Sequence, residues 1–419
     1  MHVSRLTRSL SFLRLSYRIM DNNKTQNPGR VIGLDCHPDT FTAALVRGNT
    51  PATAQVEKTF DQVPIGRLES WVRKNSTQED VIVLETSGNS FQIVRFLHKL
   101  GRKAVVLESG FVGKLKEAHA NNDKISAVRI AKAYLSGTAK VVWVPDEKTQ
   151  QRRDWHHAHQ KAVKRTTQMR NRLISYLSDN AVRLPKGTPL AGGGEQTVKV
   201  IRQAANWSDR QWQVIEILLA ELQHAEQQRI KWRSLIAQEV AADPVLMSLM
   251  RLCGVRVLIA FALGAVIGDI RRFANPKALV KYVGLNPAFD HSGQNRWQGG
   301  IGGHGRKDIR SLLIEGAQSI LRSKHPMAKW GKKLLARKGL KNLTVAAMAR
   351  KLTVSIWYLM MGRWTPLADI DSRLKDKIGK LISMIGPATL KARNLKRKSF
   401  RENLQTLLLN HNTHVPPLA

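Results

Sequence analysis

Carboxylates stand at the ends of short apolar runs in the first part of the chain. Asp35 directly follows residues 31–34, and Glu85 directly follows residues 81–84. Short apolar runs that end in turn residues predict buried strands. Acids at the ends of such strands would lie along one edge of a sheet, where α/β proteins usually carry their chemistry. A further acid, Asp123, precedes a helical pattern.

Each of these acids also has a structural alternative. Asp35 is followed by a turn that contains Pro38 and Asp39, so its carboxylate could cap that turn after a core strand. Asp123 lies just before residues 127–135, where an acid at a helix start contributes roughly 0.5–1 kcal/mol. The residues alone leave both alternatives open.

Cysteine and histidine offer few further sites. The two cysteines, Cys36 and Cys253, can build neither a disulfide framework nor a cysteine-based zinc site, so a reducing compartment is expected. His156, His157 and His159 lack accompanying acids at ligand spacing apart from one aspartate. We therefore predict that these histidines lie on a solvated or phosphate-facing surface.

The charge of the chain points to a polyanionic partner. Its 68 Lys and Arg against 31 Asp and Glu give a formal net charge of +37, which favours nucleic acid. An acidic membrane surface is the rival, but the longest apolar stretch, residues 257–268, is too short to span a bilayer. The basic residues are spread along the chain, as suits a protein that encloses nucleic acid. The predicted nucleic-acid contacts are Arg152, Arg153, Lys164, Arg165, Gly254, Arg256, Arg306 and Lys307.

Strands and helices alternate in the first 147 residues. We predict a hairpin over residues 31–46, further strands at 80–85 and 103–107, and helices at 64–74, 90–100 and 127–135. This alternation predicts an α/β sheet with helices packed on its faces.

The rest of the chain reads as mostly helical. Residues 208–242 carry apolar side chains at helical spacing and predict a coiled-coil arm, paired within the chain or with a second subunit. Residues 252–256 and the following apolar helix resemble a helix-hairpin-helix element, in which backbone N–H groups hold phosphate. An ordinary buried helix pair is the alternative there. Further helices are predicted at 148–177, 308–320 and 342–361.

Motifs in both halves of the chain occur in the order of one known family. Asp35 after VIGL, Glu85 after VIVL and Asp123-Lys-Ile-Ser-Ala come in the strand context of a RuvC-like fold. The downstream motifs are Leu252-Cys-Gly, Arg272-Phe273, Tyr282-Val-Gly-Leu-Asn-Pro287, His291-Ser292-Gly293, Gly305-Arg306 and Ile309-Arg310-Ser-Leu-Leu. Over residues 31–363 the chain resembles the DEDD transposases of the IS110 family, relatives of Piv-type DNA invertases.

The resemblance implies an N-terminal RuvC-like (ribonuclease H-like) α/β domain, a helical coiled-coil arm and a mostly α-helical C-terminal transposase domain. It implies that Asp35, Glu85 and Asp123 hold Mg²⁺ or Mn²⁺ and that Ser292 is the nucleophile. The family's fourth acid falls at Ser126, which brings no charge. Either three acids and a DNA phosphate suffice, or this copy is weakened.

The implied function is that of an insertion-sequence transposase or site-specific recombinase. Such a protein cuts and rejoins donor and target DNA, is guided by a structured bridge RNA and acts as a dimer or tetramer. We expect it in the bacterial cytoplasm, on the nucleoid and without a membrane. Two alternatives stay open: a weakened derivative that binds nucleic acid without cutting it, and a RuvC-like metal-dependent nuclease that forms no covalent intermediate.

The predicted organisation has five segments. The tail is expected either to lie on nucleic acid as a basic helical arm or to be solvated. The segments are a disordered leader at 1–30, the RuvC-like domain at 31–147 with a helical continuation to about 182, a linker and arm at 183–245, the transposase domain at 246–365 and the basic tail at 366–419.

Overall fold

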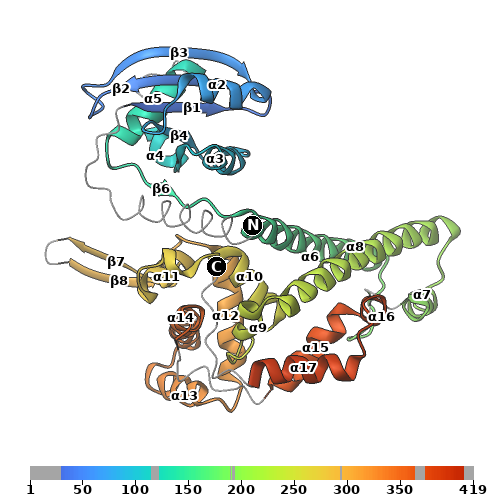
Figure 1. The fold of residues 1–419 in the computed structure, drawn as a ribbon. Coiled ribbons are helices and arrows are strands. Elements are labelled where there is room, and N and C mark those ends of the chain that lie inside the picture. Colours follow the sequence, from blue (N-terminus) through green and yellow to red (C-terminus); the bar gives the residue numbers. More distant parts are fainter. Residues whose placement is uncertain are drawn as a thin grey trace. The chain divides into compact units, whose positions relative to one another are not determined.

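A computed structural model of the chain describes residues 30–114, 122–188, 190, 194–292, 295–363 and 373–409. The chain forms two compact units, which meet in sequence between Glu147 and Lys148 (Figure 1). The predicted leader, except for Arg30, lies outside the described residues.

The first unit is a six-stranded sheet with helices on both faces. Its strand order is β3-β2-β1-β4-β5-β6, in which β1, β4 and β5 are parallel and the other three run antiparallel to their neighbours. The predicted α/β architecture is thus confirmed. The strands are β1 (Val31–Cys36), β2 (Thr40–Arg47), β3 (Gln55–Pro64), β4 (Val81–Glu85), β5 (Lys103–Leu107) and β6 (Val141–Val142). The helices are η1 (Ile65–Arg67), α2 (Leu68–Asn75), α3 (Ser90–Lys99), α4 (Ser109–Lys114) and α5 (Asp123–Leu135).

Successive side chains of β1 point to opposite faces of this sheet. Ile32 and Leu34 pack in the core beneath α2 and α3, whereas Val31 belongs to the core beneath α5. Gly33 and Asp35 share the side of Val31, because side chains alternate along a strand. A Cβ atom on Gly33 would lie only 1.9 Å from the carbonyl oxygen of Ala127. Helix α5 therefore crosses β1 in direct backbone contact.

Two elements of the first unit differ from the predictions. Strand β3 was not predicted, because its residues are mostly polar and exposed along the sheet edge. Helix α5 begins at Asp123 rather than at residue 127, since the Asn122 side chain caps it by accepting a hydrogen bond from the Ile125 N–H at 2.8 Å. The predicted hairpin at 31–46 is confirmed, with Asp35 opposite Thr42.

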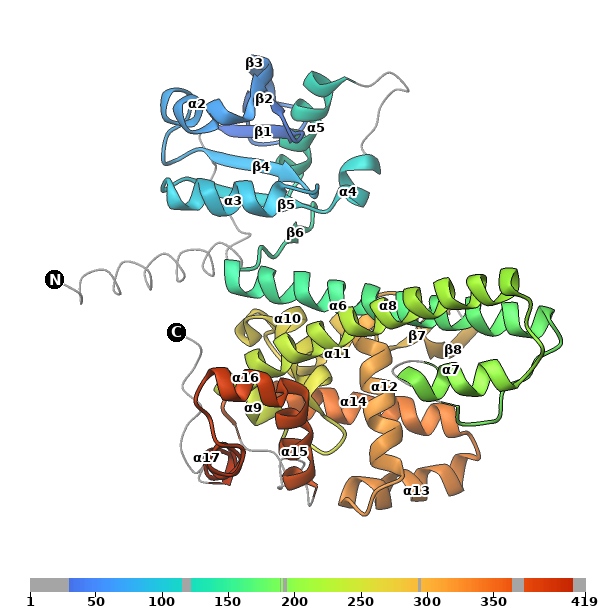
Figure 2. The ribbon, with the colours of Figure 1, turned by 90° about the vertical axis from the view of Figure 1, so that its right-hand side faces the viewer.

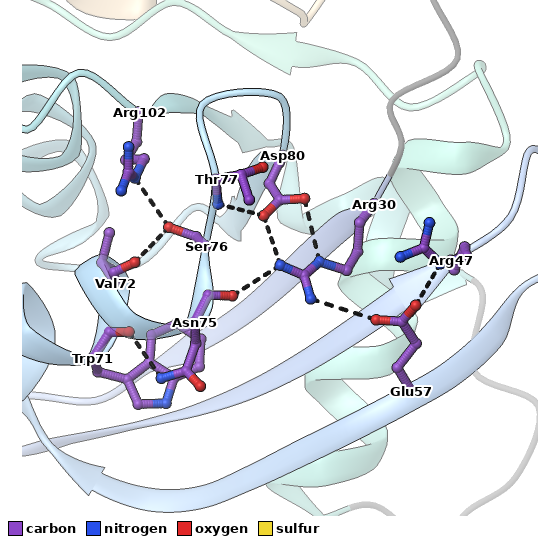
Figure 3. Close-up of polar contacts among 10 residues, drawn as sticks. All are labelled: Arg30, Arg47, Glu57, Trp71, Val72, Asn75, Ser76, Thr77, Asp80 and Arg102. Carbon is purple, nitrogen blue, oxygen red and sulfur yellow. Dashed lines mark hydrogen bonds and ion pairs between the residues drawn. The ribbon is translucent and has the colours of Figure 1, made fainter.

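A charged network ties down the beginning of β1 (Figure 3). Arg30 donates two hydrogen bonds to Asp80, at 3.2 and 2.8 Å, and one to the Asn75 carbonyl at 2.9 Å. It also pairs with Glu57 of β3 at 3.4 Å. Burial alone would raise the pKa of Asp80, but Arg30 and the Thr77 N–H outweigh it and hold that pKa below its usual value. The network fixes β1 to its neighbours at the end opposite Asp35.

The second unit is helical except for one described hairpin, β7–β8. Its largest core is built from the helices that follow residue 236. Among the described residues, no helix is both long and apolar enough to cross a membrane. The elements are α6 (Glu147–Asp179), α7 (Gly194–Gln203), α8 (Asp209–Ala242), α9 (Pro244–Leu249), α10 (Val257–Ile267), η2 (Ile270–Arg272), α11 (Pro276–Val283), β7 (Pro287–Ser292), β8 (Asn295–Ile301), α12 (Lys307–Leu321), α13 (Pro326–Lys338), α14 (Lys341–Met360), α15 (Leu374–Ile385), α16 (Pro387–Ala392) and α17 (Arg397–Leu409).

The long helices α6 and α8 lie side by side (Figures 1 and 2). Leu173 of α6, Ile201 of α7 and Leu218 of α8 share one buried cluster. Ser208 caps α8 in a reciprocal capping box with Gln211. Much of the apolar stripe of residues 208–242 thus packs within the same chain, whereas Ile230 and Leu235 stay exposed.

The basic C-terminal segment is not a solvated tail over its described part. Helices α15, α16 and α17 pack against the second unit, and Ile378, Leu381 and Leu408 are buried in its main core. Lys377 is buried too, and its ammonium group donates to the carbonyl oxygens of Met250 and Leu252 at 2.9 and 2.8 Å. Periodic apolar residues between the lysines and arginines account for this packing.

Gly33→Ala tests the contact between β1 and α5. We expect this variant to lose about 1–3 kcal/mol of unfolding free energy, because the new methyl group overlaps the Ala127 carbonyl. Urea titration of the full chain measures the loss. Gly66→Ala is the matched control, since its Cβ would meet no atom within 4 Å. Equal urea midpoints for the two variants would show that α5 is not in close contact with β1 at Gly33.

Candidate active site

The predicted strand-end acids lie at one edge of the sheet. Leu34 and Leu84 are paired in the parallel register of β1 and β4, and Asp35 and Glu85 are the next residues of those strands. Val31 and Val83 pack in the core on the α5 side, so the strand alternation turns Asp35 and Glu85 toward the same side. Both acids are partly buried.

Helix α5 brings a third acid to this edge. Asp123 is its first residue, and the ligand atoms of Asp35, His37 and Asp123 all lie within 4.8 Å of one another. The His37 Nε2 atom is 3.5 Å from a carboxylate oxygen of Asp123. Glu85 is not a member of this close group. The structure therefore brings together two of the three predicted acids and adds a histidine.

His37 was missed as a candidate ligand, although it stands only two residues after Asp35. It lies in the turn between β1 and β2, and its carbonyl oxygen accepts a hydrogen bond from the Asn89 side chain at 3.0 Å. This bond links the turn to the start of α3. The spacing from Asp35 was the only signal in the sequence.

The environment of Asp35 combines burial with opposing charges. Burial raises the pKa of Asp35, His37 lowers it, and nearby Asp123 raises it again, with a net increase above the ordinary value. A raised pKa is expected where two acids share a small space without a cation between them.

Ser126 takes part in this site through a hydrogen bond. Its hydroxyl bonds to the Asp35 carboxylate, and the Arg129 guanidinium lies 3.0 Å from its oxygen. A fourth acid expected from the family pattern is thus replaced by a neutral hydroxyl with a cation behind it. Both groups lower the pKa of Asp35, so they favour its charged form.

A tether fixes the start of α5 from the other side. Lys124 pairs with Asp61 of β3 at 3.2 Å, and Asp61 also accepts a hydrogen bond from the buried Thr42 hydroxyl at 3.1 Å. Thr42 lies opposite Asp35 in the hairpin. The polar edge strand that the sequence did not reveal therefore helps to position Asp123.

This group fits a divalent cation. Two carboxylates offer the oxygen ligands typical of Mg²⁺ and Mn²⁺, and an imidazole adds a nitrogen ligand. Burial and the neighbouring Asp123 carboxylate raise the pKa of Asp35, and a cation bound between the two acids would oppose that increase. Asp35 and Asp123 would hold the ion, with His37 beside them and Glu85 on the adjacent strand.

Ser292 lies in the second unit, as the last residue of β7 and opposite Asn295 of β8. Its side chain lies outside the described part of the structure. The base of the hairpin is held firmly: Arg310 donates to the carbonyl oxygens of His304 and Gly284, at 2.7 and 3.2 Å. A Cβ atom on Gly305 would lie 2.7 Å from the Gly284 backbone. These motif residues thus position the hairpin.

Another pair of motifs packs beside α10. The Arg272 guanidinium lies over the rings of Phe273 and Tyr282, 4.2 and 4.4 Å from their centroids. It also donates to the Ile267 carbonyl at 2.9 Å. The Arg-Phe motif and the distant tyrosine therefore form one structural contact.

Two of the predicted nucleic-acid contacts are bound by other groups of the protein. Arg152 is buried and donates to Glu239 at 2.9 and 2.6 Å, and its guanidinium also pairs with buried Asp243. Arg153 donates to the carbonyl oxygens of Ala265 and Val266, at 3.1 and 3.3 Å. Buried Arg152 stabilises the unit instead of facing a polyanion, whereas Arg153 is partly exposed and stays a prediction. The acids and carbonyls that bind them come from distant helices, which charge counting does not reveal.

The other predicted contacts divide by exposure. Lys164, Arg165, Arg256 and Lys307 are exposed and stay candidates. Arg306 is tied to Asp308 by two hydrogen bonds, at 3.0 and 2.7 Å.

Gly254 is buried, contrary to an open phosphate-holding turn. Its φ is +83°, and a Cβ atom there would lie 2.6 Å from the Gly316 carbonyl oxygen. Glycine is therefore needed for the backbone conformation and for packing on α12. The helix pair α9–α10 matches the buried alternative at this position.

The prediction of a solvated surface is wrong for two of the three α6 histidines, whereas His157 is exposed. His156 and His159 are buried, and His156 Nε2 lies 3.4 Å from Asp308. Burial, with the nearby charges of His156, Arg233 and Arg229, lowers the pKa of His159 to about 4. This side chain is therefore neutral near pH 7 and belongs to the interior.

Fold and site together fit a ribonuclease H-like domain with a cluster of acids at the strand ends. A model of the IS110 DEDD transposase domain matches residues 32–180, and a model of the transposase IS116/IS110/IS902 family matches residues 247–331. The chain belongs to the IS110 family of transposases.

Curated relatives agree with this assignment. The transposase for insertion sequence element IS1111A of Coxiella burnetii is 24% identical, over 67% of this chain and 77% of its own length. A Pseudomonas aeruginosa protein named for family 20 transposases is 23% identical, over 67% and 83%. The y4qE protein of Sinorhizobium fredii, which bears a transposase name, is 25% identical, over 55% of this chain and 56% of its own length.

Arg152→Met separates a structural arginine from an exposed one. We expect a loss of about 3 kcal/mol in unfolding free energy, because the buried Asp243 carboxylate loses its partner. Arg165→Met removes the same charge from an exposed site and is expected to change stability by less than about 0.5 kcal/mol. Urea titration of both variants gives the comparison. A stable Arg152→Met protein would contradict the structural role.

Proposed function

We propose that this chain cuts and rejoins donor and target DNA by means of acids that hold a divalent metal ion and a serine nucleophile. The observation that carries the proposal is the meeting of Asp35 and Asp123, with ligand atoms of both and of His37 within 4.8 Å. Family membership supports DNA cutting and joining as the general activity.

In this proposal, the acids of the first unit would hold a metal ion beside the phosphate at which the DNA is cut. A bound Mg²⁺ or Mn²⁺ supplies positive charge that stabilises the negative charge developing on the phosphate oxygens. Asp35, Asp123 and Glu85 would provide the negative charge that holds the ion. His37 orients the Asp123 carboxylate, and Ser126 orients that of Asp35.

Ser292 acts as the nucleophile. Its oxygen forms a bond to phosphorus, the bond from phosphorus to a sugar oxygen breaks, and the serine proton is lost while the leaving oxygen gains one. The DNA end is then held as a phosphoserine ester, and attack by another sugar hydroxyl restores the serine. Because acids and serine belong to different units, the reacting groups come together within one chain or between the copies of a dimer or tetramer.

In this proposal, a bridge RNA selects the DNA sequences that are cut and joined. Base pairing between RNA and DNA would select donor and target sites, while the protein holds the backbones without reading bases. The net charge of +37 supports such a double cargo. Exposed Lys164, Arg165, Arg256 and Lys307 are proposed backbone contacts.

Covalent capture tests this function. End-labelled donor and target DNA are incubated with protein, bridge RNA and Mg²⁺, and the labelled protein–DNA adduct is measured after denaturation. Ser292→Ala is expected to abolish the adduct, and Asp35→Asn to reduce it about a hundredfold, through loss of metal charge at the phosphate. Ser178→Ala and Asp179→Asn, on the exposed end of α6, are matched controls. An undiminished adduct in Ser292→Ala would exclude this nucleophile.

A second candidate, a derivative that binds nucleic acid without cutting it, is favoured by Ser126 at the fourth-acid position. Ser126→Asp restores that acid and is expected to raise strand transfer at least about tenfold if the copy is weakened. If the wild-type protein were as active as this variant, the hypothesis of a weakened copy would be excluded. Cut DNA without any adduct would instead support the metal-dependent nuclease.

A further inference from the structure

A cavity of about 520 Å³ opens in the second unit between the turn before α10, the end of α12 and the helices α15 and α17. Cys253, Gly254 and Arg256 line it from the turn, and Ser319 and Ser323 line it from α12. The C-terminal segment supplies the remaining wall. This segment lies beyond both matched family models, the second of which ends at residue 331.

The wall of this cavity is strongly positive. Seven basic side chains line it, and Asp376 is its single acid. One of the seven, Lys377, already binds two backbone carbonyl oxygens and is buried. The other six are Arg256, Arg373, Lys375, Lys380, Arg397 and Arg401, and all six are exposed.

Elsewhere in the same unit, several basic side chains are paired with acids. Arg152 is neutralised by Glu239 and Asp243, and Arg306 by Asp308. Among the described residues, no ion pair involves Lys380, Arg397 or Arg401. Like charges gathered in this way repel one another, and an anion between them removes the repulsion.

The Arg401 side chain of α17 lies close to Gly379 of α15. A Cβ atom there would lie 3.5 Å from a terminal guanidinium nitrogen of Arg401. Helix α17 therefore brings the Arg401 side chain directly onto α15. The basic wall is a product of helix packing, not a row of lysines on a free tail.

A second cavity of about 570 Å³ continues the first, because Ser383 and Arg397 line both. It adds Lys391 and Lys396 over an apolar floor that includes Pro387, Leu390 and Leu395. Basic groups along a continuous path suit successive phosphates of a polymer better than one small anion. The apolar floor suits the sugars or bases between those phosphates.

We propose that these two cavities form a binding track for the sugar–phosphate backbone of a nucleic-acid strand. The proposal rests on the proposed function only for the kind of polyanion that is present. The track is made by the C-terminal helices together with exposed Arg256 in the turn before α10, and it uses none of the residues assigned to the metal or the nucleophile.

The test is fluorescence anisotropy with labelled single-stranded DNA and RNA oligonucleotides of the same sequence. EDTA is present, so binding is read without metal or cutting, and loss of catalysis cannot imitate loss of the track. The variant is Lys380→Gln/Arg397→Gln/Arg401→Gln. Its control, Lys332→Gln/Lys333→Gln/Arg337→Gln, removes the same charge from exposed positions of α13. Thermal unfolding curves check that both proteins are folded.

The track variant is expected to bind at least about tenfold more weakly, and the slope of log affinity against log salt is expected to fall by about 2, since single strands give about 0.7 per phosphate contact. The control should lose much less. A larger loss for RNA than for DNA assigns the track to the guide, and the reverse assigns it to DNA. Equal losses in both triple variants, or competition by inorganic phosphate as strong as that by oligonucleotide, would overturn the proposal.

Discussion

The contact between Gly33 and the Ala127 carbonyl is the constraint on which the candidate site depends. Only a residue without a side chain lets α5 lie against β1 at this distance. The contact sets the first turn of α5 at the carboxyl ends of β1 and β4, so Asp123 and Ser126 reach Asp35. The Asn122 cap and the Lys124–Asp61 pair then fix the start of the helix. Packing thus concentrates acids that would repel one another without a cation.

The basic residues of the second unit fall into two groups. Inside the second unit, positive groups are matched by acids or carbonyl oxygens, as at Arg152 and Lys377. On its surface they are left in excess, as in the cavity that α15 and α17 line together with Arg256. A net charge of +37 therefore does not mean that every arginine faces nucleic acid. The structure separates residues that stabilise the fold from those available to a polyanion.

Much of the fold could be predicted from the sequence, because short apolar runs and helical periodicity mark buried elements directly. The same runs located Asp35 and Glu85, and the family pattern added Asp123. His37 was missed because a turn histidine acquires a role only when a distant helix brings an acid to it. Strand β3 was missed because it pairs with β2 at the sheet edge and its mostly exposed residues do not show the apolar pattern of a buried strand. Arg152 was misassigned because its acidic partners lie on another helix.

The most direct test of the account is a double-mutant cycle on metal binding, measured by Mn²⁺ electron paramagnetic resonance with the full chain. Asp35→Asn and Asp123→Asn should each weaken Mn²⁺ binding about tenfold or more, and the double variant should lose much less than the product of the two, because both acids hold one ion. Independent effects that multiply, or binding unchanged in either single variant, would contradict a shared site built by the approach of α5 to β1.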